Sequence, residues 1–321
     1  MRIVFAGTGT FGLPTLRALV EGGQEIALMI TQPDRPSGRG QGVKIGPIKW
    51  FAREQGITVI QPESINEPDT VARLRAIAPD LLLVIAYGQK VGPHILEIPH
   101  WRAVNLHASL LPRYRGAAPM NWAIINGETE TGLSVIDMVD QIDAGDILGQ
   151  RATTIDPAET AGDLHERLSQ LGARVVSEVV RELPLEEVER RRQNENQVTW
   201  APRLTKADGL IDWAKPAGQV FNHIRGVTPW PSAYTYLAMK GRKPSLRLVI
   251  DRAVPGLAGG AKGEPGTIIA AADDGIEVAT ARGTVRIIHL TPAGKRAMTA
   301  ADFSHGHSLA PGMRLSSEQG K

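Results

Sequence analysis

The chain has 321 residues, 42% of them hydrophobic, and it contains no cysteine. This length exceeds most single hydrophobic cores, so two domains are expected, and the lack of cysteine excludes disulfides and thiolate metal sites. No apolar run reaches the roughly 20 residues of a membrane span, and the first residues lack a signal peptide's basic start and unbroken apolar run. We therefore expect a cytoplasmic protein without a membrane role.

Charge is divided unevenly along the chain, although the formal net charge is only +2. Residues 1–206 carry 22 Lys and Arg against 25 Asp and Glu, a net of −3, while residues 207–321 carry 14 against 9, a net of +5. A basic C-terminal part suggests a polyanionic partner. An excess of five charges is also within ordinary surface variation, so both interpretations stay open.

The first half of the chain alternates short apolar runs with helical patterns. These predict strands at 2–6, 25–30, 80–85 and 103–107, and helices at 11–21 and 48–55. Strands that are apolar on both faces and separated by helices form parallel sheets covered on both sides. We therefore expect a Rossmann-like, doubly wound α/β domain, whose ligands bind beyond the carboxyl ends of the strands.

The glycines of the first turn match a known fingerprint. Gly7-Thr8-Gly9-Thr10-Phe11-Gly12 fits G-x-G-x-x-G between a strand and a helix, which is the context of a dinucleotide site. The acid that would bind the ribose is missing, because the second strand ends at Thr31-Gln32. We favour glycines that allow a tight turn and close packing, and keep a nicotinamide-dependent oxidoreductase as an alternative from another class.

The chain changes character after residue 189. Residues 161–189 predict a helix broken at Pro184, and the polar, exposed cluster that follows predicts a linker.

The C-terminal part reads as β structure. Short alternating segments joined by turns occur at 266–270, 276–280 and 284–290, which is typical of a small antiparallel barrel or sandwich. We expect an N-terminal catalytic domain at 1–189, a linker at 190–206, and a C-terminal OB-like β-barrel domain at 207–321.

Three groups suited to acyl transfer lie between residues 105 and 146. Asn105 and His107 are two residues apart at the end of a predicted strand, so their side chains point to the same side. There the amide can donate a hydrogen bond to a developing oxyanion while the imidazole moves a proton, and Asp143 could hold one ring nitrogen. Each residue alone is more often structural, so only the combination indicates catalysis.

The motifs that contain these residues resemble the folate-dependent formyltransferases. They are N-x-H at 105–107, S-L-L-P at 109–112, R-Y-R-G-A-A-P at 113–119 and D-A-G-D-I-L at 143–148. The resemblance covers almost the whole chain. Four further segments are similar to the members of this family that act on methionyl-tRNA, at 31–40, 86–99, 201–213 and 224–235.

The resemblance implies a direct transfer of the formyl group of 10-formyltetrahydrofolate to the amino group of initiator methionyl-tRNA. It also implies that Asn105, His107 and Asp143 form the catalytic set. We expect no metal, because the chain has no cysteine and His305 and His307 have no neighbouring acid except Asp302. Expected folate-binding residues are Ser109, Leu110, Leu111, Pro112, Tyr87, Gly88 and Asp140, although plain core packing explains one of the two leucines equally well. The chain departs from the family pattern at Val139 and Gln141, where Asp and Gly are common.

The expected tRNA contacts lie outside this segment. The loop between the second strand and the second helix is longer than usual and carries Arg35, Arg39 and Lys44 against Asp34. The family uses this loop to engage the acceptor end, and Arg39 is the position that the resemblance singles out. A solvated loop without a partner stays an alternative.

Further cations are assigned to the tRNA body. They belong to the C-terminal barrel and are Lys206, Arg225, Lys240, Arg242, Lys243 and Arg247. Arg113-Tyr114-Arg115 could meet either the tRNA terminus or the donor's glutamate tail. The same chemistry on a small amine, such as an amino sugar or glycinamide ribonucleotide, is the nearest alternative function, and we expect a monomer.

Overall fold

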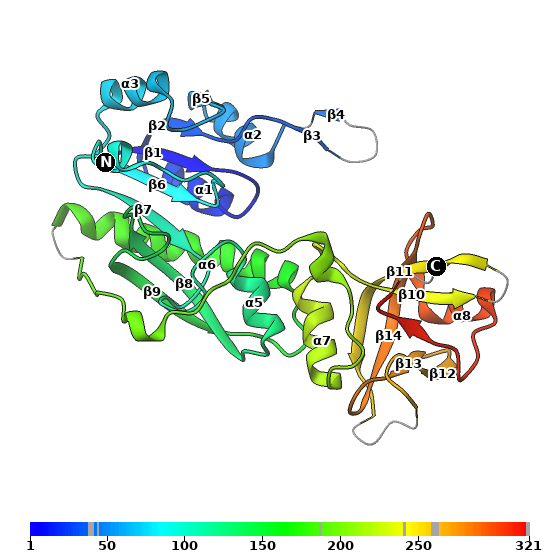
Figure 1. The fold of residues 1–321 in the computed structure, drawn as a ribbon. Coiled ribbons are helices and arrows are strands. Elements are labelled where there is room, and N and C mark those ends of the chain that lie inside the picture. The colour runs from blue at the N-terminus through cyan, green and yellow to red at the C-terminus, as the bar shows by residue number, and fades with distance from the viewer. Residues whose placement is uncertain (38–41, 44, 186–187, 240–241, 258–262, 319–321) are drawn as a thin grey trace. The chain divides into compact units, whose positions relative to one another are not determined.

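The computed structural model describes residues 1–37, 42–43, 45–185, 188–239, 242–257 and 263–318. The chain forms two compact units (Figure 1). The first contains residues 1–116, 131–153 and 165–201, and the second contains residues 117–130, 154–164 and 202–321.

The first unit is built on a seven-stranded sheet with the order β5-β2-β1-β6-β7-β8-β9 (Figure 1). Its strands are β1 (Arg2–Gly7), β2 (Glu25–Ile30), β5 (Val59–Ile60), β6 (Leu81–Ile85), β7 (Arg102–His107), β8 (Glu130–Asp137) and β9 (Ile147–Thr154). From β5 to β7 neighbouring strands are parallel, and β8 runs antiparallel to β7. The predicted Rossmann-like domain is thus confirmed.

Helices cover this sheet and join its strands. They are α1 (Leu13–Glu21), α2 (Pro47–Glu54), α3 (Pro68–Ile77), α4 (Pro93–Leu96) and α6 (Ala161–Glu182). The predicted break at Pro184 is confirmed, because α6 is followed by a 3-10 turn at Leu183–Leu185. Two short strands, β3 (Pro36–Ser37) and β4 (Gly42–Val43), pair antiparallel within the long loop between β2 and α2.

The glycine fingerprint is explained by packing. A Cβ at Gly7 would lie 2.8 Å from the carbonyl oxygen of Ile85, and one at Gly12 would lie 3.1 Å from the ring of Phe5. Gly9 has a φ of +79°, in the left-handed region that glycine adopts without strain. The three glycines therefore allow the tight turn and the close approach of α1 to the sheet.

The second unit is an antiparallel sheet curled into a barrel. The strand order is β12-β13-β14-β11-β10-β16, with β15 beside β14. The strands are β10 (Ala233–Met239), β11 (Arg242–Pro255), β12 (Ile268–Ala272), β13 (Gly275–Ala279), β14 (Thr284–Pro292), β15 (Met298–Thr299) and β16 (Leu315–Ser316). The amide of Ile268 donates to the carbonyl oxygen of Met313, and that of Leu315 to Gly266, both at 2.8 Å. Since Leu315 also belongs to β16, these bonds join the two ends of the sheet and confirm the predicted OB-like barrel.

Three helices accompany the barrel. They are α5 (Pro119–Ile125), α7 (Ala217–Gly226) and α8 (Ala300–His307). A 3-10 turn at Lys206–Gly209 belongs to the same unit, and another at Glu195–Gln197 belongs to the first unit. Phe303 of α8 and Ile224 of α7 are buried with Ile250 and Leu290 of the barrel in one hydrophobic core. This apolar core gives the unit its own stability.

Candidate active site

Asn105 and His107 lie at the carboxyl end of β7, as the sequence predicts. Asn105 is in register with Val84 of β6 and Ile136 of β8, and His107 is opposite Ser134. The His107 side chain is buried, and Asn105 is partly exposed. Because β6 and β7 are parallel, the loops after both strands leave from this edge of the sheet.

The fold brings Asp143 to these two side chains from the loop between β8 and β9. Asn105 Nδ2 lies 3.5 Å from Asp143 Oδ1, and His107 Nδ1 lies 3.6 Å from Asp143 Oδ2. The backbone N–H of Gly116 donates to Asp143 Oδ2 at 2.8 Å. An amide, an imidazole and a carboxylate that span 38 residues of sequence thus form one cluster.

The hydrogen bonds of His107 fix which ring nitrogen can move a proton. Its Nε2 lies 2.9 Å from the carbonyl oxygen of Tyr114. A carbonyl oxygen only accepts, so Nε2 must carry a hydrogen and donate it. Nδ1 then has a free lone pair in the neutral ring, and it faces the Asp143 carboxylate. A proton taken up at Nδ1 would be stabilised by that negative charge.

Comparison with known proteins agrees with this geometry. A family model described as formyl transferase matches residues 1–180, and one described as formyl transferase, C-terminal domain, matches residues 203–308. The chain belongs to the formyltransferase family.

Curated relatives within this family cover nearly the full length. The methionyl-tRNA formyltransferase of Geobacter sulfurreducens is 44% identical over 98% of this chain and 96% of its own length. The methionyl-tRNA formyltransferase of Bacillus mycoides is 41% identical over 98% of both chains.

Two solved structures share the fold at low identity. HypX from Aquifex aeolicus in complex with tetrahydrofolic acid has a TM-score of 0.61 and 18% identity, over 95% of this chain and 47% of HypX. WlaRD, a sugar 3N-formyl transferase, has a TM-score of 0.64 and 17% identity, over 92% of this chain and 99% of its own.

The S-L-L-P turn at 109–112 is stabilised by its own side chains. Ser109 is buried and donates its hydroxyl to the carbonyl oxygen of Arg113 at 2.6 Å, while Leu111 packs in a cluster with Ile136 and Ile147. Leu110 and Pro112 are partly exposed. The side chains of Ser109 and Leu111 therefore shape the turn, and a folate contact by Leu110 or Pro112 stays a prediction.

The loop after β6 offers backbone rather than side-chain groups. The Tyr87 side chain is buried in the hydrophobic core, and this burial, with the nearby charge of Glu67, raises the pKa of its hydroxyl to about 12. Its carbonyl oxygen accepts hydrogen bonds from Thr8 and Gln32, both at 3.2 Å. Gly88 has a φ of +89°.

Asp140 is exposed on the loop that carries Asp143. It forms an ion pair of 2.6 Å with Lys90, from the loop after β6. The contact joins the loop after β6 to the loop between β8 and β9.

The predicted tRNA contacts are only partly covered by the described residues. Arg35 is exposed, whereas Arg39 and Lys44 lie outside the described residues. The carboxylate of Asp34 is not free to pair with these cations, because Lys49 of α2 and Gln61 both donate hydrogen bonds to it.

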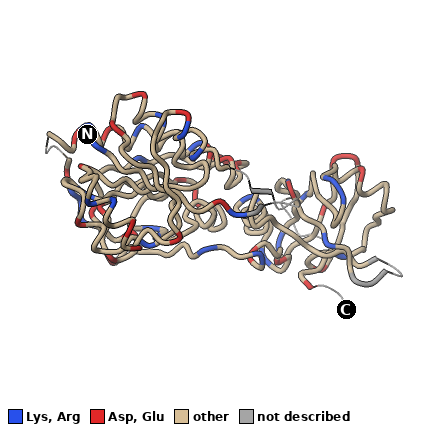
Figure 2. Tube along the Cα trace, turned by 90° about the horizontal axis from the view of Figure 1, so that it is seen from above, with Lys and Arg blue, Asp and Glu red and all other residues tan. Residues whose placement is uncertain are grey.

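Two arginines that the sequence assigned to substrates are buried. Arg115 is only 3% exposed, so its prediction as a contact to the tRNA terminus or the glutamate tail is wrong. Arg225 is 7% exposed and donates to the carbonyl oxygen of Glu159 at 3.0 Å, so it is not part of a tRNA-facing surface. Arg247 is exposed over the ring of Tyr234, while the side chains of Lys240, Arg242 and Lys243 are outside the described part. Figure 2 shows positive and negative residues interspersed along both units.

One residue that the sequence analysis missed supports the Asp143 loop. Gln193 belongs to the polar cluster at 190–196, whose other members are exposed as predicted, but Gln193 itself is only 5% exposed. Its side chain donates to the carbonyl oxygens of Asp143 and Gly145. No local pattern marks it, because the contact spans 50 residues.

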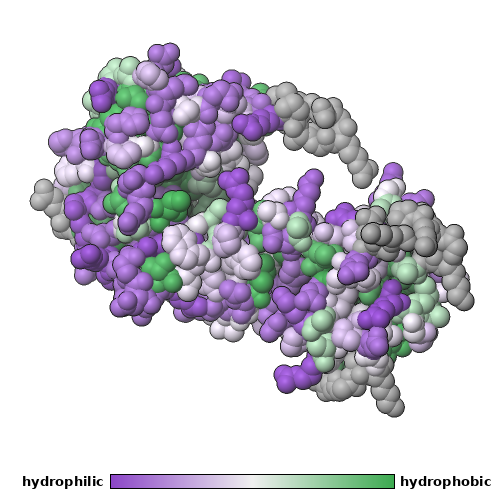
Figure 3. Space-filling view, in the orientation of Figure 1, coloured by the Kyte–Doolittle hydropathy of each residue, from purple (hydrophilic) through white to green (hydrophobic). Residues whose placement is uncertain are grey.

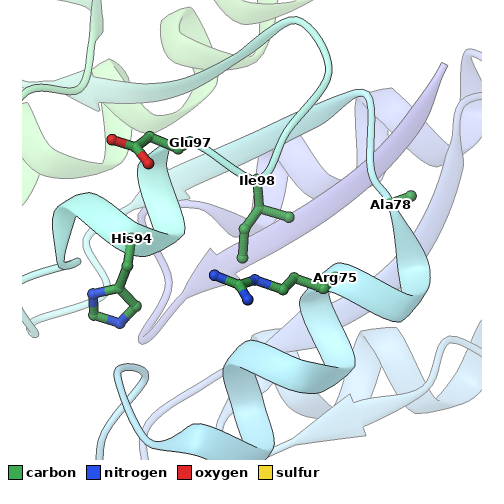
Figure 4. A pocket seen from close by; sticks show the side chains of 5 residues that line it. All are labelled: Arg75, Ala78, His94, Glu97 and Ile98. Atoms are coloured by element: carbon green, nitrogen blue, oxygen red, sulfur yellow. The ribbon is translucent and has the colours of Figure 1, made fainter.

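A shallow pocket lies elsewhere in the first unit. Its lining residues are Arg75, Ala78, His94, Glu97 and Ile98, and the Arg75 side chain extends toward Ile98 (Figure 4). Arg75 and Ala78 lie before β6 in the chain and the other three before β7, whereas Asn105 and His107 lie at the carboxyl end of β7. The pocket is therefore not the candidate active site.

The described residues show neither a metal site nor a membrane segment. They contain no group of three or more His, Asp or Glu that could hold a metal ion, and no helix long and apolar enough to cross a membrane. On the face shown in Figure 3, hydrophobic residues reach the surface between hydrophilic ones.

Proposed function

We propose that this chain transfers the formyl group of 10-formyltetrahydrofolate to the amino group of initiator methionyl-tRNA. The observation that carries the proposal is the meeting of Asn105, His107 and Asp143 at the carboxyl end of a parallel strand. This cluster holds a hydrogen-bond donor, a proton acceptor and an anion, which is what acyl transfer to an amine requires.

The proposed reaction proceeds by direct attack. The uncharged amine forms a bond to the formyl carbon, and the carbonyl oxygen becomes an oxyanion that Asn105 Nδ2 stabilises by a hydrogen bond. His107 Nδ1 accepts the proton that the attacking nitrogen loses, and Asp143 stabilises the imidazolium across 3.6 Å. The bond from the formyl carbon to the folate nitrogen then breaks, and that nitrogen takes the proton.

The identity of the formyl acceptor is inferred from the relatives and not from the Asn105 cluster. The curated relatives that cover nearly the whole chain at 41 to 45% identity are named methionyl-tRNA formyltransferases. The long loop with Arg35 and Arg39 supplies cations for a phosphate backbone, and residues 207–321 add a net charge of +5. A small amine would need neither feature.

We extend the proposal to the setting of the reaction. The enzyme acts in the cytoplasm as a monomer. Residues 1–189 form its catalytic domain, residues 190–206 a linker, and residues 207–321 the domain that binds the tRNA body.

The test is transfer of label from 10-formyltetrahydrofolate. The protein is incubated with methionyl initiator tRNA, with unacylated tRNA as the control, and in parallel with glycinamide ribonucleotide and an amino sugar nucleotide. We expect label on methionyl-tRNA alone. Label on a small amine but not on the tRNA would refute the proposed acceptor while leaving formyl transfer intact, and label on none of them would refute both.

A further inference from the structure

Arg115 and Gln193 form a buried pair directly behind the Asp143 loop. The guanidinium of Arg115 donates to Gln193 Oε1 from Nε at 3.1 Å and from Nη2 at 2.9 Å. Nη1 and Nη2 also donate to the carboxylate of Glu195, at 3.2 and 2.7 Å. A buried charge is costly unless it is paired and hydrogen-bonded, and these four contacts meet that requirement.

The pair fixes the direction in which the Gln193 amide points. Because Arg115 donates to Oε1 with two nitrogens, the amide oxygen cannot turn away without breaking both bonds. The NH2 group then faces the Asp143 loop and donates to the carbonyl oxygens of Asp143 at 2.8 Å and of Gly145 at 2.7 Å. Both of its hydrogens are thus committed to the backbone of this loop.

The loop needs such support because of its conformation. Asp143 has a φ of +52°, in the left-handed region that residues with a Cβ adopt uncommonly. A residue keeps such a conformation only when its surroundings impose it. Gln193 holds the loop in this conformation by donating hydrogen bonds to the backbone carbonyl oxygens of Asp143 and Gly145.

The backbone next to Arg115 also contacts the carboxylate of Asp143. The next residue, Gly116, donates its N–H to Asp143 Oδ2 at 2.8 Å. The position of this segment is set by hydrogen bonds from the Arg115 amide to Thr199 at 2.9 Å and from the Ala201 amide to the Arg115 carbonyl at 2.7 Å. The side chain and the backbone of Arg115 therefore both help to place the same residue, Asp143.

We propose that Arg115 and Gln193 are positioning residues, which hold Asp143 at the distance from Asn105 and His107 that formyl transfer requires. They act through Asp143 and touch no reacting atom. The inference rests on the proposed function of the Asn105 cluster.

The experiment compares Gln193→Leu and Gln193→Glu with the wild type. Gln193→Glu keeps an acceptor for Arg115 but has no hydrogen to donate to the two carbonyl oxygens. We expect both variants to lower kcat for formyl transfer at least 30-fold, with the KM of donor and acceptor changed less than threefold. Arg190→Ala is the control, because Arg190 is an exposed member of the same polar cluster and is outside the Arg115–Gln193 network, and its kcat should stay within twofold.

A purely structural role predicts a different outcome. It would leave kcat per folded molecule unchanged and alter only the urea midpoint, and this result for Gln193→Glu would overturn the proposal. The double variant Arg115→Met/Gln193→Leu should be no slower than the slower single variant, since one acts through the other. Additive losses would show that Arg115 does not act through Gln193.

Two readouts separate this inference from the proposed function. Wild-type transfer to methionyl-tRNA tests the function by itself. A crystal structure of the Gln193→Glu variant tests the positioning without any substrate, and should show the Asp143 carboxylate displaced from Asn105 and His107. An unmoved carboxylate would refute the inference even if the wild-type enzyme proves fully active.

Discussion

A substitution at Gly145 tests how closely the Asp143 loop packs against the end of β8. A Cβ at Gly145 would lie 1.8 Å from the carbonyl oxygen of Asp137, whereas real Cβ atoms essentially never come within 3.0 Å. In a Gly145→Ala variant the loop and the end of β8 must therefore separate by at least about 1.2 Å. Asp137 is held in place by two hydrogen bonds from Arg102, at 2.8 and 2.7 Å, so the loop is the part that moves.

This displacement has a cost in stability and in rate. The bond from the Asp137 amide to the Asp146 carbonyl oxygen, 2.9 Å long, would be stretched beyond hydrogen-bond reach. Together with the steric strain we expect a loss of about 1–3 kcal/mol in the free energy of unfolding. Asp143 would shift by a similar distance, and a misplacement of about 1 Å lowers a rate roughly 100-fold.

The assay is single-turnover formyl transfer by saturating enzyme, with urea unfolding measured in parallel. Gly218→Ala is the control, because a Cβ there meets no atom within 4 Å and Ala favours a helix over Gly by about 0.5–1 kcal/mol. A Gly145→Ala enzyme that keeps the wild-type rate and stability would refute the reasoning, since the Gly145 backbone is outside the left-handed region and offers no other reason for a defect.

Three further outcomes are expected. Asn105→Ala and His107→Ala should each lower single-turnover transfer at least about 100-fold with folding intact by circular dichroism, and a near-normal rate would remove that residue from the mechanism. Arg39→Ala should raise the KM for methionyl-tRNA more than that for the folate donor, whereas equal changes would mean that the loop shapes the folate pocket. The hydrogen bond from Lys49 lowers the pKa of Asp34, so Asp34 stabilises the fold above the ordinary carboxyl pKa of about 3.9 and loses this effect as the pH falls through its depressed value. Asp34→Asn should therefore lower the urea unfolding free energy by about 1–2 kcal/mol at pH 7, with the difference from wild type shrinking below about pH 4, and a difference independent of pH would contradict this.

The sequence could predict the parts of the fold that local patterns determine. The strand at 25–30 has the same bounds in the structure, and the strand at 103–107 begins one residue earlier, at Arg102. The first has a continuous apolar stretch at 26–30, and the second has an apolar start at Ala103-Val104, as expected for strands of a covered sheet. The same patterns placed Asn105 and His107 at a strand end, where ligands of such sheets bind.

The contacts that complete the site could not be predicted in this way. Arg115 follows a tyrosine in a motif with two arginines, and composition alone suggested a surface cation. Its burial depends on Gln193, which is 78 residues away, and the sequence has no periodicity that relates the two. The antiparallel strand β8, which precedes the Asp143 loop, was also not assigned, because its place beside β7 depends on pairing between residues that are distant in sequence.

The way Asp143 is held also explains how the loop tolerates its departures from the family pattern. Val139 is 47% exposed, and Gln141 is exposed as well, so neither side chain packs beneath the loop. The bonds that place Asp143 come instead from the Gly116 amide and the Gln193 side chain. The close approach to β8 depends on Gly145, which matches the family pattern. Since the departures fall on outward-facing positions and the anchors do not change, the loop can vary in sequence while the carboxylate keeps its place beside Asn105 and His107.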